Sequence, residues 1–283
     1  MNDRVNTAII TSIDQYYEEN LEFDFLETLF NKAHYSGSVI ILDYGMSEEA
    51  SRRISKRFPV VMYKYEKDFS VFFNRCKHIP EIINSLDENI EQVMVVDGGD
   101  VWFQCAIDQM FRETKNKVGI VAENRIVGED DWTDRGMQNL HDKTREKVLS
   151  VLKGKLVANA GVVCGDRNKV AYIYRMVYED VLESGIEYFG VDQLFLNYEW
   201  YQLDETERVY MDCKYNYVMV SHSTDEYIIE DDIVYDAKDR SVITVVHNAG
   251  GNWRIIKRPF KNRYVNENQY YIENATSIDK KYR

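Results

Sequence analysis

The chain has 283 residues, of which 45% are hydrophobic and 13% aromatic, so it is long enough for a large core and too apolar for a disordered protein. Its formal net charge of −13 opposes binding to a polyphosphate strand, so no nucleic-acid partner is expected. The charge is uneven: residues 250–283 hold eight basic and three acidic side chains, a net charge of +5, which leaves −18 for the rest.

No apolar run reaches the roughly 18 residues of a membrane-spanning helix. The N-terminus lacks the apolar core and the cleavage site of a signal peptide. The four cysteines are widely spaced without a Cys-x-x-Cys pair, a pattern of scattered thiols in a reducing compartment rather than of a zinc site or a disulfide framework. We therefore expect a cytoplasmic protein.

The first part of the chain alternates strand-length, β-branched runs with helical stretches. The runs are NTAIITSI, GSVIILDYG, PVVMYKY, QVMVVDGG and KVGIVAEN. Residues 17–33 carry apolar side chains at helical spacing, and Ser47 followed by two glutamates is typical of the first turn of another helix. This alternation is typical of βαβ units and predicts an α/β fold with a largely parallel sheet.

The second part of the chain is less regular. Residues 123–155 are polar and charged, KLVANAGVVCGD then has the pattern of a strand that its glycines allow to bend, and residues 168–183 have that of a helix. Two shorter strands, YNYVMVSH and SVITVVHNA, are predicted on either side of an acidic loop at residues 230–232.

The sequence has no internal repeat and no low-complexity linker. We therefore expect a single domain over residues 1–260, whose halves, 1–104 and 105–260, share one sheet. Residues 261–283 form a basic, aromatic tail.

Two acidic residues follow the fourth strand-like run, in VMVVDGGDVWF. Asp97 and Asp100 flank two glycines at the carboxyl end of a strand, which is where open α/β sheets bind ligands. Two carboxylates folded onto one point repel each other unless a cation lies between them, and such oxygen ligands suit Mg²⁺ or Mn²⁺. An Asp-Gly turn that closes an ordinary hairpin is the alternative.

A second candidate segment is SVITVVHNAGGNWRIIKRP. His247 follows a β-branched strand and can complete a mixed oxygen and nitrogen coordination shell, although a hydrogen-bonded structural histidine is the alternative. Gly250 and the basic side chains of Arg254, Lys257 and Arg258 can hold phosphate oxygens.

Two further segments place small or polar residues next to apolar runs. In GVDQLFLNYEW, Asp192 and Gln193 open a helix, where they are either ordinary first-turn residues or groups aimed at polyol hydroxyls. In LVANAGVVCGD, Asn159, Ala160 and Gly161 interrupt a bulky strand, which indicates either tight packing or a ligand wall.

The first strand-like run ends in TSIDQYY, which places Thr11 and Tyr16 near the first βα loop, where a tyrosine face can stack on a nucleotide base. This loop has no glycine, which argues against the phosphate loop of sugar nucleotidyltransferases. Gly-x-Gly-x-x-Gly and phosphate-loop lysine motifs are also absent. A phosphatase with an aspartyl nucleophile would need an acid where Gly99 stands.

Taken in order, TSIDQYY, VVDGGDVWF, VANAGVVCGD, GVDQLFLNY, KYNYVMVS and HNAGG resemble the motif series of glycosyltransferases with the GT-A fold, particularly the glycogenin-like and bacterial lipopolysaccharide galactosyltransferase group of family 8. The resemblance spans residues 7–260. It implies a Rossmann-like, mostly parallel sheet flanked by helices, with a smaller mixed-sheet acceptor half. It also implies transfer of a hexose from a nucleotide sugar, commonly a UDP-sugar, to a hydroxyl group with retention of configuration.

The resemblance implies roles for single residues. In that family the acidic motif and a late histidine hold Mn²⁺, or Mg²⁺, on the donor diphosphate, and the usual Asp-x-Asp is replaced here by Asp97-Gly-Gly-Asp100, closer to the Asp-x-x-Asp of collagen-modifying glycosyltransferase domains. Arg75 matches a basic residue that reaches the donor sugar or the motif carboxylates. The implied assignments are Asp97, Asp100 and His247 to the metal, Asp192 and Gln193 to catalysis, and Thr11, Tyr16, Arg75, Asn159, Ala160 and Gly161 to the donor. The Lys-Pro that follows the histidine segment in that family is displaced here, so Gly250, Arg254 and Lys257 are candidates for donor binding on their own chemistry.

We therefore expect a metal-dependent hexosyltransferase of bacterial surface glycan synthesis, with a glycan, glycolipid or protein hydroxyl as acceptor and residues 123–155 as a mobile lid. Residues 250–283 also contain six aromatic side chains, and basic and aromatic residues together predict peripheral contact with the inner face of an anionic membrane. A GT-A module that binds nucleotide sugar or glycan without turnover is the alternative.

Overall fold

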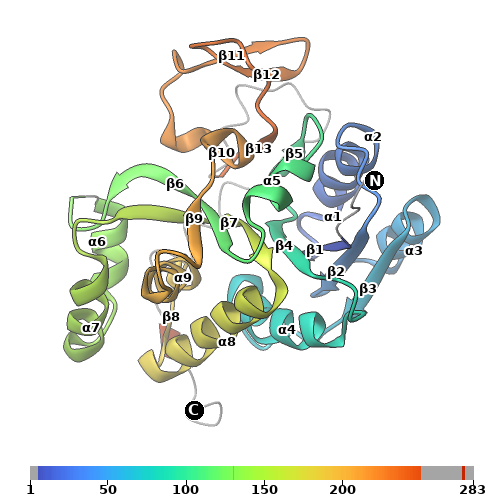
Figure 1. Cartoon of the computed structure of the whole chain (residues 1–283). Coiled ribbons are helices and arrows are strands. Elements are labelled where there is room, and N and C mark those ends of the chain that lie inside the picture. Colours follow the sequence, from blue (N-terminus) through green and yellow to red (C-terminus); the bar gives the residue numbers. More distant parts are fainter. Residues whose placement is uncertain (1–5, 130, 250–275, 278–283) are drawn as a thin grey trace.

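The structure, a computed structural model, describes residues 6–129, 131–249 and 276–277. Seven strands form its central sheet: β1 (Thr7–Ile13), β2 (Ser38–Asp43), β3 (Val60–Lys64), β4 (Gln92–Asp97), β6 (Val118–Ile126), β7 (Leu156–Asp166) and β9 (Arg208–Tyr210). Their order is β3-β2-β1-β4-β7-β6-β9 (Figure 1). All neighbours are parallel except the two pairs that β7 makes with β4 and β6, which confirms the predicted, mostly parallel α/β fold.

Helices cover both faces of the sheet. They are α1 (Glu18–Asn20), α2 (Glu27–Asn31), α3 (Glu48–Arg57), α4 (Val71–Ser85), α5 (Asp108–Glu113), α6 (Asp131–Gln138), α7 (Asp142–Leu152), α8 (Arg167–Ser184) and α9 (Val191–Gln202). One face packs against α4, α7, α8 and α9, and the other against α2, α3 and α5. Ile9 and Ile10 of β1 point to opposite faces and both are fully buried, as expected where helices cover both sides of a parallel sheet.

The helix start predicted at Ser47 is confirmed, and α8 has a similar cap that was not predicted. The Ser47 side chain caps α3 by accepting a hydrogen bond from the Ala50 amide, and the Asp166 side chain caps α8. Residues 17–33, predicted as one helix, instead form α1, a π-helical turn over Leu21–Leu26 and α2. The Thr28 hydroxyl donates there to the Asp24 carbonyl, a side-chain bond of the kind that distorts helices.

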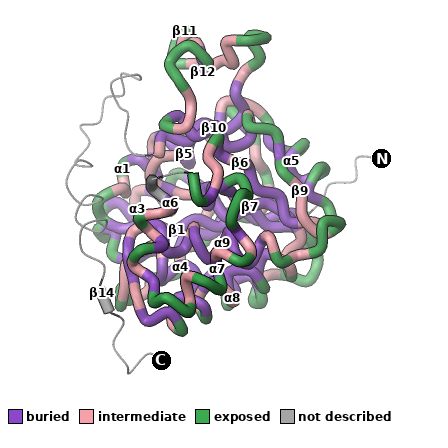
Figure 2. The backbone as a smooth tube through the Cα atoms, turned by 90° about the vertical axis from the view of Figure 1, so that its left-hand side faces the viewer, coloured by how far each residue is buried: buried purple, intermediate pink, exposed green. Residues whose placement is uncertain are grey.

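Besides the central sheet, the fold contains a three-stranded sheet and a β-hairpin that projects from the body (Figures 1 and 2). The sheet has the order β10-β13-β5, with β5 (Val101–Phe103), β10 (Tyr217–Val218) and β13 (Val245–His247). The strands predicted in YNYVMVSH and SVITVVHNA are therefore much shorter than expected. The first of them, β10, is followed by a 3₁₀ turn at Met219–Ser221 and preceded by another at Cys213–Tyr215.

The acidic segment predicted as a loop is the tip of the projecting hairpin, β11 (Tyr227–Glu230) and β12 (Ile233–Asp236). Asp231 and Asp232 both have positive φ angles, 49° and 62°. Two successive residues of this kind make the two-residue turn whose twist matches that of the flanking strands.

Two short strands, β8 (Ile186–Glu187) and β14 (Thr276–Ser277), pair in antiparallel fashion. Apart from this pair of residues, the predicted tail lies outside the described part of the chain. Over the residues that the structure describes, no helix is long and apolar enough to cross a membrane.

Candidate functional site

The candidate site lies at the carboxyl end of β4, next to β1. The strand order reverses at this point, because β2 and β3 extend the sheet on one side of β1 and β4 lies on the other. Asp97, the last residue of β4, is paired with Ser12 near the end of β1. Ligands of open α/β sheets bind at such a switch point, outside the carboxyl ends of the strands.

Asp97, Asp100 and His247 converge there. Asp100 immediately precedes β5, and the antiparallel pairing of β5 with β13 sets Val101 opposite His247. His247 Nε2 lies 3.5 Å from Asp100 Oδ2 and 3.8 Å from Asp97 Oδ2. One ligand atom from each of the three residues lies within 4.8 Å of the others, so the group can hold a metal ion. The structure thus brings together the three residues predicted as metal ligands.

Two glycines allow the close packing around these ligands. A Cβ atom at Gly161 of β7 would lie 2.2 Å from His247 Cε1, so β7 can pass the imidazole only without a side chain at this position. Tight packing, one of the two alternatives for Asn159-Ala160-Gly161, is therefore present at Gly161, with His247 as the neighbour. At Gly98, a Cβ atom would lie 2.5 Å from the Thr11 hydroxyl oxygen.

A chain of amide side chains orients His247. Its Nδ1 lies 3.0 Å from Asn216 Oδ1, Asn216 Nδ2 donates to Asn159 Oδ1 at 2.9 Å, and Asn159 Nδ2 donates to Glu123 Oε1 at 2.7 Å. Because the nitrogen of the Asn216 amide is already committed, its oxygen accepts from His247 Nδ1. His247 Nε2 is thereby directed at the two carboxylates, as is usual for metal-binding histidines.

The electrostatic field at His247 favours positive charge. Burial opposes the charged form of the imidazole, but Asp100 and Asp97 outweigh burial and raise the pKa of His247 above its usual value. The same field would attract a cation to this point.

Arg75 of α4 joins the metal motif to the start of α9. Its guanidinium, 3% exposed, donates to Asp97 Oδ1 and, at 2.8 Å, to Asp192 Oδ2. Burial opposes its charge, but Asp97 and Asp192 raise the pKa of Arg75 well above its usual value. Arg75 therefore occupies one oxygen of Asp97 and leaves the other, Oδ2, facing His247.

Glu123, at the carboxyl-end side of β6, was not predicted as a site residue. It is 6% exposed, and its Oε1 accepts hydrogen bonds from Asn159 Nδ2 and, at 3.3 Å, from Gln193 Nε2. Its Oε2 accepts from the Ser221 hydroxyl at 2.9 Å and lies 3.4 Å from Arg125 Nε. Asp97 was identified as an acid that directly follows a buried apolar run. Glu123 likewise follows the buried run KVGIVA, so the same signal could have identified it.

The Gln193 amide is held at both ends. Its Oε1 accepts from the Ala160 backbone amide at 3.1 Å, while its Nε2 donates to Glu123. The orientation of this amide is therefore determined by partners on β6 and β7. Asn216 lies in the motif segment KYNYVMVS, but neither its contact with His247 nor this orientation of Gln193 was predicted from the sequence.

The other residues predicted to contact the donor are not gathered in this way. Thr11 is 1% exposed, and within the described residues its hydroxyl has no hydrogen-bond partner, whereas Tyr16 lies 40% exposed after β1. Their contact with a base stays a prediction. Gly250, Arg254 and Lys257 lie outside the described residues.

Solved structures similar to this chain include the galactosyltransferase LgtC in complex with donor and acceptor sugar analogues, with a TM-score of 0.57, 15% sequence identity, and coverage of 98% of this chain and 99% of that chain. An active-site mutant of LgtC, glutamine to glutamate, aligns with a TM-score of 0.56 at the same identity and coverage. No protein-family model and no curated protein matches the chain. At this identity the likeness shows the fold, which is that of GT-A glycosyltransferases.

Replacing Arg75 tests the ion-pair arrangement. Arg75→Met leaves Asp97 and the buried Asp192 without their shared cation, and we expect a loss of about 3–5 kcal/mol in the free energy of unfolding, measured in urea. Arg52→Met, on the exposed side of α3, is the matched control and should change stability by less than about 0.5 kcal/mol. Equal stabilities of the two variants would contradict this account of Arg75.

Replacing Asn216 tests the orientation of His247. Asn216→Ala removes the acceptor of His247 Nδ1, and we expect the affinity for Mn²⁺, measured by electron paramagnetic resonance, to fall about 10- to 100-fold. Asn31→Ala, at an exposed amide of α2, should leave that affinity unchanged. An Asn216→Ala protein that binds Mn²⁺ as wild type does would refute the orienting role.

Proposed function

We propose that this chain is a metal-dependent glycosyltransferase that moves a hexose from a nucleotide sugar, most commonly a UDP-sugar, to a hydroxyl group of a glycan, glycolipid or protein. The observation that carries the proposal is the convergence of Asp97, Asp100 and His247 at the switch point of a GT-A fold. Galactosyltransferase LgtC, whose structure is similar, supports the reaction class.

Charge explains why donor binding would need a cation. The diphosphate of a nucleotide sugar is anionic, and Asp97 and Asp100 would repel it. Arg75 does not resolve the conflict, because Asp97 and Asp192 already share it. Mn²⁺ or Mg²⁺ fits the donor set of two carboxylates and an imidazole, and when bound it supplies positive charge against the departing nucleoside diphosphate.

The protein itself would position the donor sugar. Arg75 holds the carboxylate of Asp192, while Glu123 and the Ala160 amide hold Gln193 in one orientation. These polar groups need no rearrangement when substrate arrives, which is the condition for effective electrostatic stabilisation. The acceptor hydroxyl oxygen then forms a bond to the anomeric carbon, the bond from that carbon to the diphosphate breaks, and the hydroxyl proton passes to the departing nucleoside diphosphate. Retention of configuration is proposed on the family 8 resemblance, with Asp192 beneath the sugar.

The second candidate is a GT-A module that binds nucleotide sugar or glycan without turnover. The presence of both motif carboxylates together with His247, in contact distance of one another, favours the enzyme. Donor binding without hydrolysis, and without transfer to any acceptor tested, would favour the binding module.

Removing one metal ligand tests the proposed reaction. Asp100→Ala should lower Mn²⁺-dependent hydrolysis or transfer from UDP-sugars about 100-fold or more, with an unchanged circular dichroism spectrum. Treatment of wild type with EDTA should cause the same loss, whereas Asp204→Ala, in the exposed loop after α9, should be fully active. Full activity of metal-stripped wild type in EDTA would overturn the mechanism.

We also propose that the tail, residues 261–283, contacts the inner face of an anionic membrane, where a lipid-linked acceptor of surface glycan synthesis would be found. Each basic side chain near such a surface contributes about 1 kcal/mol. Deletion of residues 261–283 removes five basic side chains and should weaken flotation with anionic liposomes, and neutral liposomes should not float the intact protein. Unchanged flotation of the truncated protein would count against membrane contact.

A further inference from the structure

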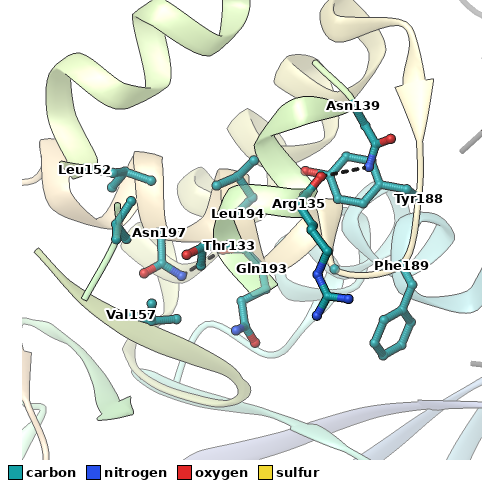
Figure 3. A pocket seen from close by; sticks show the side chains of 13 residues that line it. Thr133, Arg135, Asn139, Leu152, Val157, Tyr188, Phe189, Gln193, Leu194 and Asn197 are labelled. Carbon is teal, nitrogen blue, oxygen red and sulfur yellow. Dashed lines mark hydrogen bonds between the residues drawn. The ribbon is translucent and has the colours of Figure 1, made fainter. Parts of the chain in front are cut away.

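A cavity of about 200 Å³ lies beside Gln193, between α6, α9 and the turn that follows β8 (Figure 3). This is less than the roughly 300–1,000 Å³ of pockets for drug-sized ligands, so the cavity suits one small ring rather than a whole nucleotide sugar. Its lining within the described residues includes none of the three metal-ligand candidates. Gln193 belongs to both the cavity and the site described above.

The cavity changes in character from its floor to its mouth. Arg135 is exposed and Phe189 is half-buried, and Figure 3 shows the Arg135 guanidinium between Gln193 and Phe189. The floor is at most 6% exposed. It contains the aliphatic side chains of Val127, Leu152, Val157 and Leu194, together with the polar side chains of Thr133 and Asn197. A ligand would therefore bury an apolar group at the floor and keep its polar part at the mouth.

Tyr188 contributes a polar group without a partner. Its side chain lines the cavity and is 6% exposed, and its hydroxyl has no hydrogen-bond partner among the described residues. Burial, with a smaller contribution from Asp192, raises the pKa of Tyr188, so the hydroxyl remains protonated and can donate. A buried donor of this kind is costly unless a ligand oxygen accepts from it.

Gly136 of α6 keeps space open in front of Tyr188. A Cβ atom at Gly136 would lie 3.3 Å from Tyr188 Cε2 and 3.4 Å from its hydroxyl oxygen. Glycine within a helix is less favourable than alanine, so helix stability does not explain its presence. The absence of a side chain preserves room at the only polar group that is both buried and unpaired among the described lining residues.

We infer that this cavity is the acceptor subsite, and that it takes one sugar ring carrying a compact methyl-bearing substituent, an N-acetyl group or a 6-deoxy carbon. The aliphatic floor receives the methyl group and Tyr188 donates to an oxygen of the sugar. The polar edge of the ring stays at the mouth, beside Gln193 and the donor sugar. This inference rests on the proposed function.

The first experiment titrates four probes onto wild type with MnCl₂ and UDP, by ligand-observed NMR. Methyl N-acetyl-β-glucosaminide is compared with methyl β-glucoside, and methyl α-L-fucoside with methyl α-L-galactoside. At least one methyl-bearing probe should bind about tenfold more tightly than its parent, since one buried methyl group discriminates on that scale. Failure of all four probes to bind, or equal affinity within both pairs, would overturn the inference.

Two variants assign that binding to the cavity. Gly136→Ala narrows the space before Tyr188, and Tyr188→Phe removes only the hydroxyl. Each variant should lower the affinity for the more tightly bound probe about 5- to 10-fold. The melting temperature of each variant should equal or exceed that of wild type. Tyr172→Phe, at an exposed tyrosine of α8, is the matched control and should bind as wild type does. Wild-type affinity in both cavity variants would overturn the assignment.

Hydrolysis of the UDP-sugar in the absence of acceptor tests whether the sugar ring in the cavity belongs to the acceptor or to the donor. The inference predicts an unchanged KM for the UDP-sugar in Gly136→Ala and Tyr188→Phe. A raised KM with unchanged probe binding would make the cavity the donor-sugar site and contradict the inference. If no UDP-sugar is bound or hydrolysed by wild type, the proposed function fails, while the probe titrations still report on the cavity.

Discussion

The fold holds two carboxylates that repel each other at one point of the sheet edge, and the candidate site depends on this arrangement. Asp97 and Asp100 both present an oxygen to His247 Nε2. Several features of the fold maintain this unfavourable arrangement: the pairing of β5 with β13, the missing side chain at Gly161, and the clamp of Arg75 on the far oxygen of Asp97. A divalent cation is the group that makes such an arrangement favourable, and an anionic donor would gain from it.

The parallel half of the fold could be predicted because its signals are local. Five β-branched runs correspond to β1, β2, β3, β4 and β6, of which all but the edge strand β3 are mostly buried, and the Ser47 cap begins α3. The three-stranded sheet could not, because β13 pairs with β5 and β10 from distant parts of the chain over only a few residues. The hairpin β11–β12 was missed because its turn, Asp231-Asp232, has no glycine to signal positive φ.

Site residues could be predicted where one segment of the sequence contains both the strand and the reactive side chain at its end. Acids at the end of an apolar strand and a histidine at the end of another identified Asp97, Asp100 and His247, and the motif order brought in Arg75. The residues that orient them act through contacts between distant segments: Asn216 lies in the motif segment KYNYVMVS, but its contact with His247, 31 residues away, is not visible in that segment. The predicted lid, residues 123–155, supplies Glu123 to the polar network and α6 and α7 to one wall of the cavity, so one segment borders both proposed substrates.

The most direct test of the account is anomalous X-ray diffraction at the manganese edge from crystals of the wild-type protein grown with MnCl₂ and UDP. The account predicts a manganese peak about 2.0–2.3 Å from a carboxylate oxygen of Asp97, one of Asp100, and the free imidazole nitrogen of His247. Saturating manganese with no peak between these three side chains, or with the peak elsewhere, would contradict it.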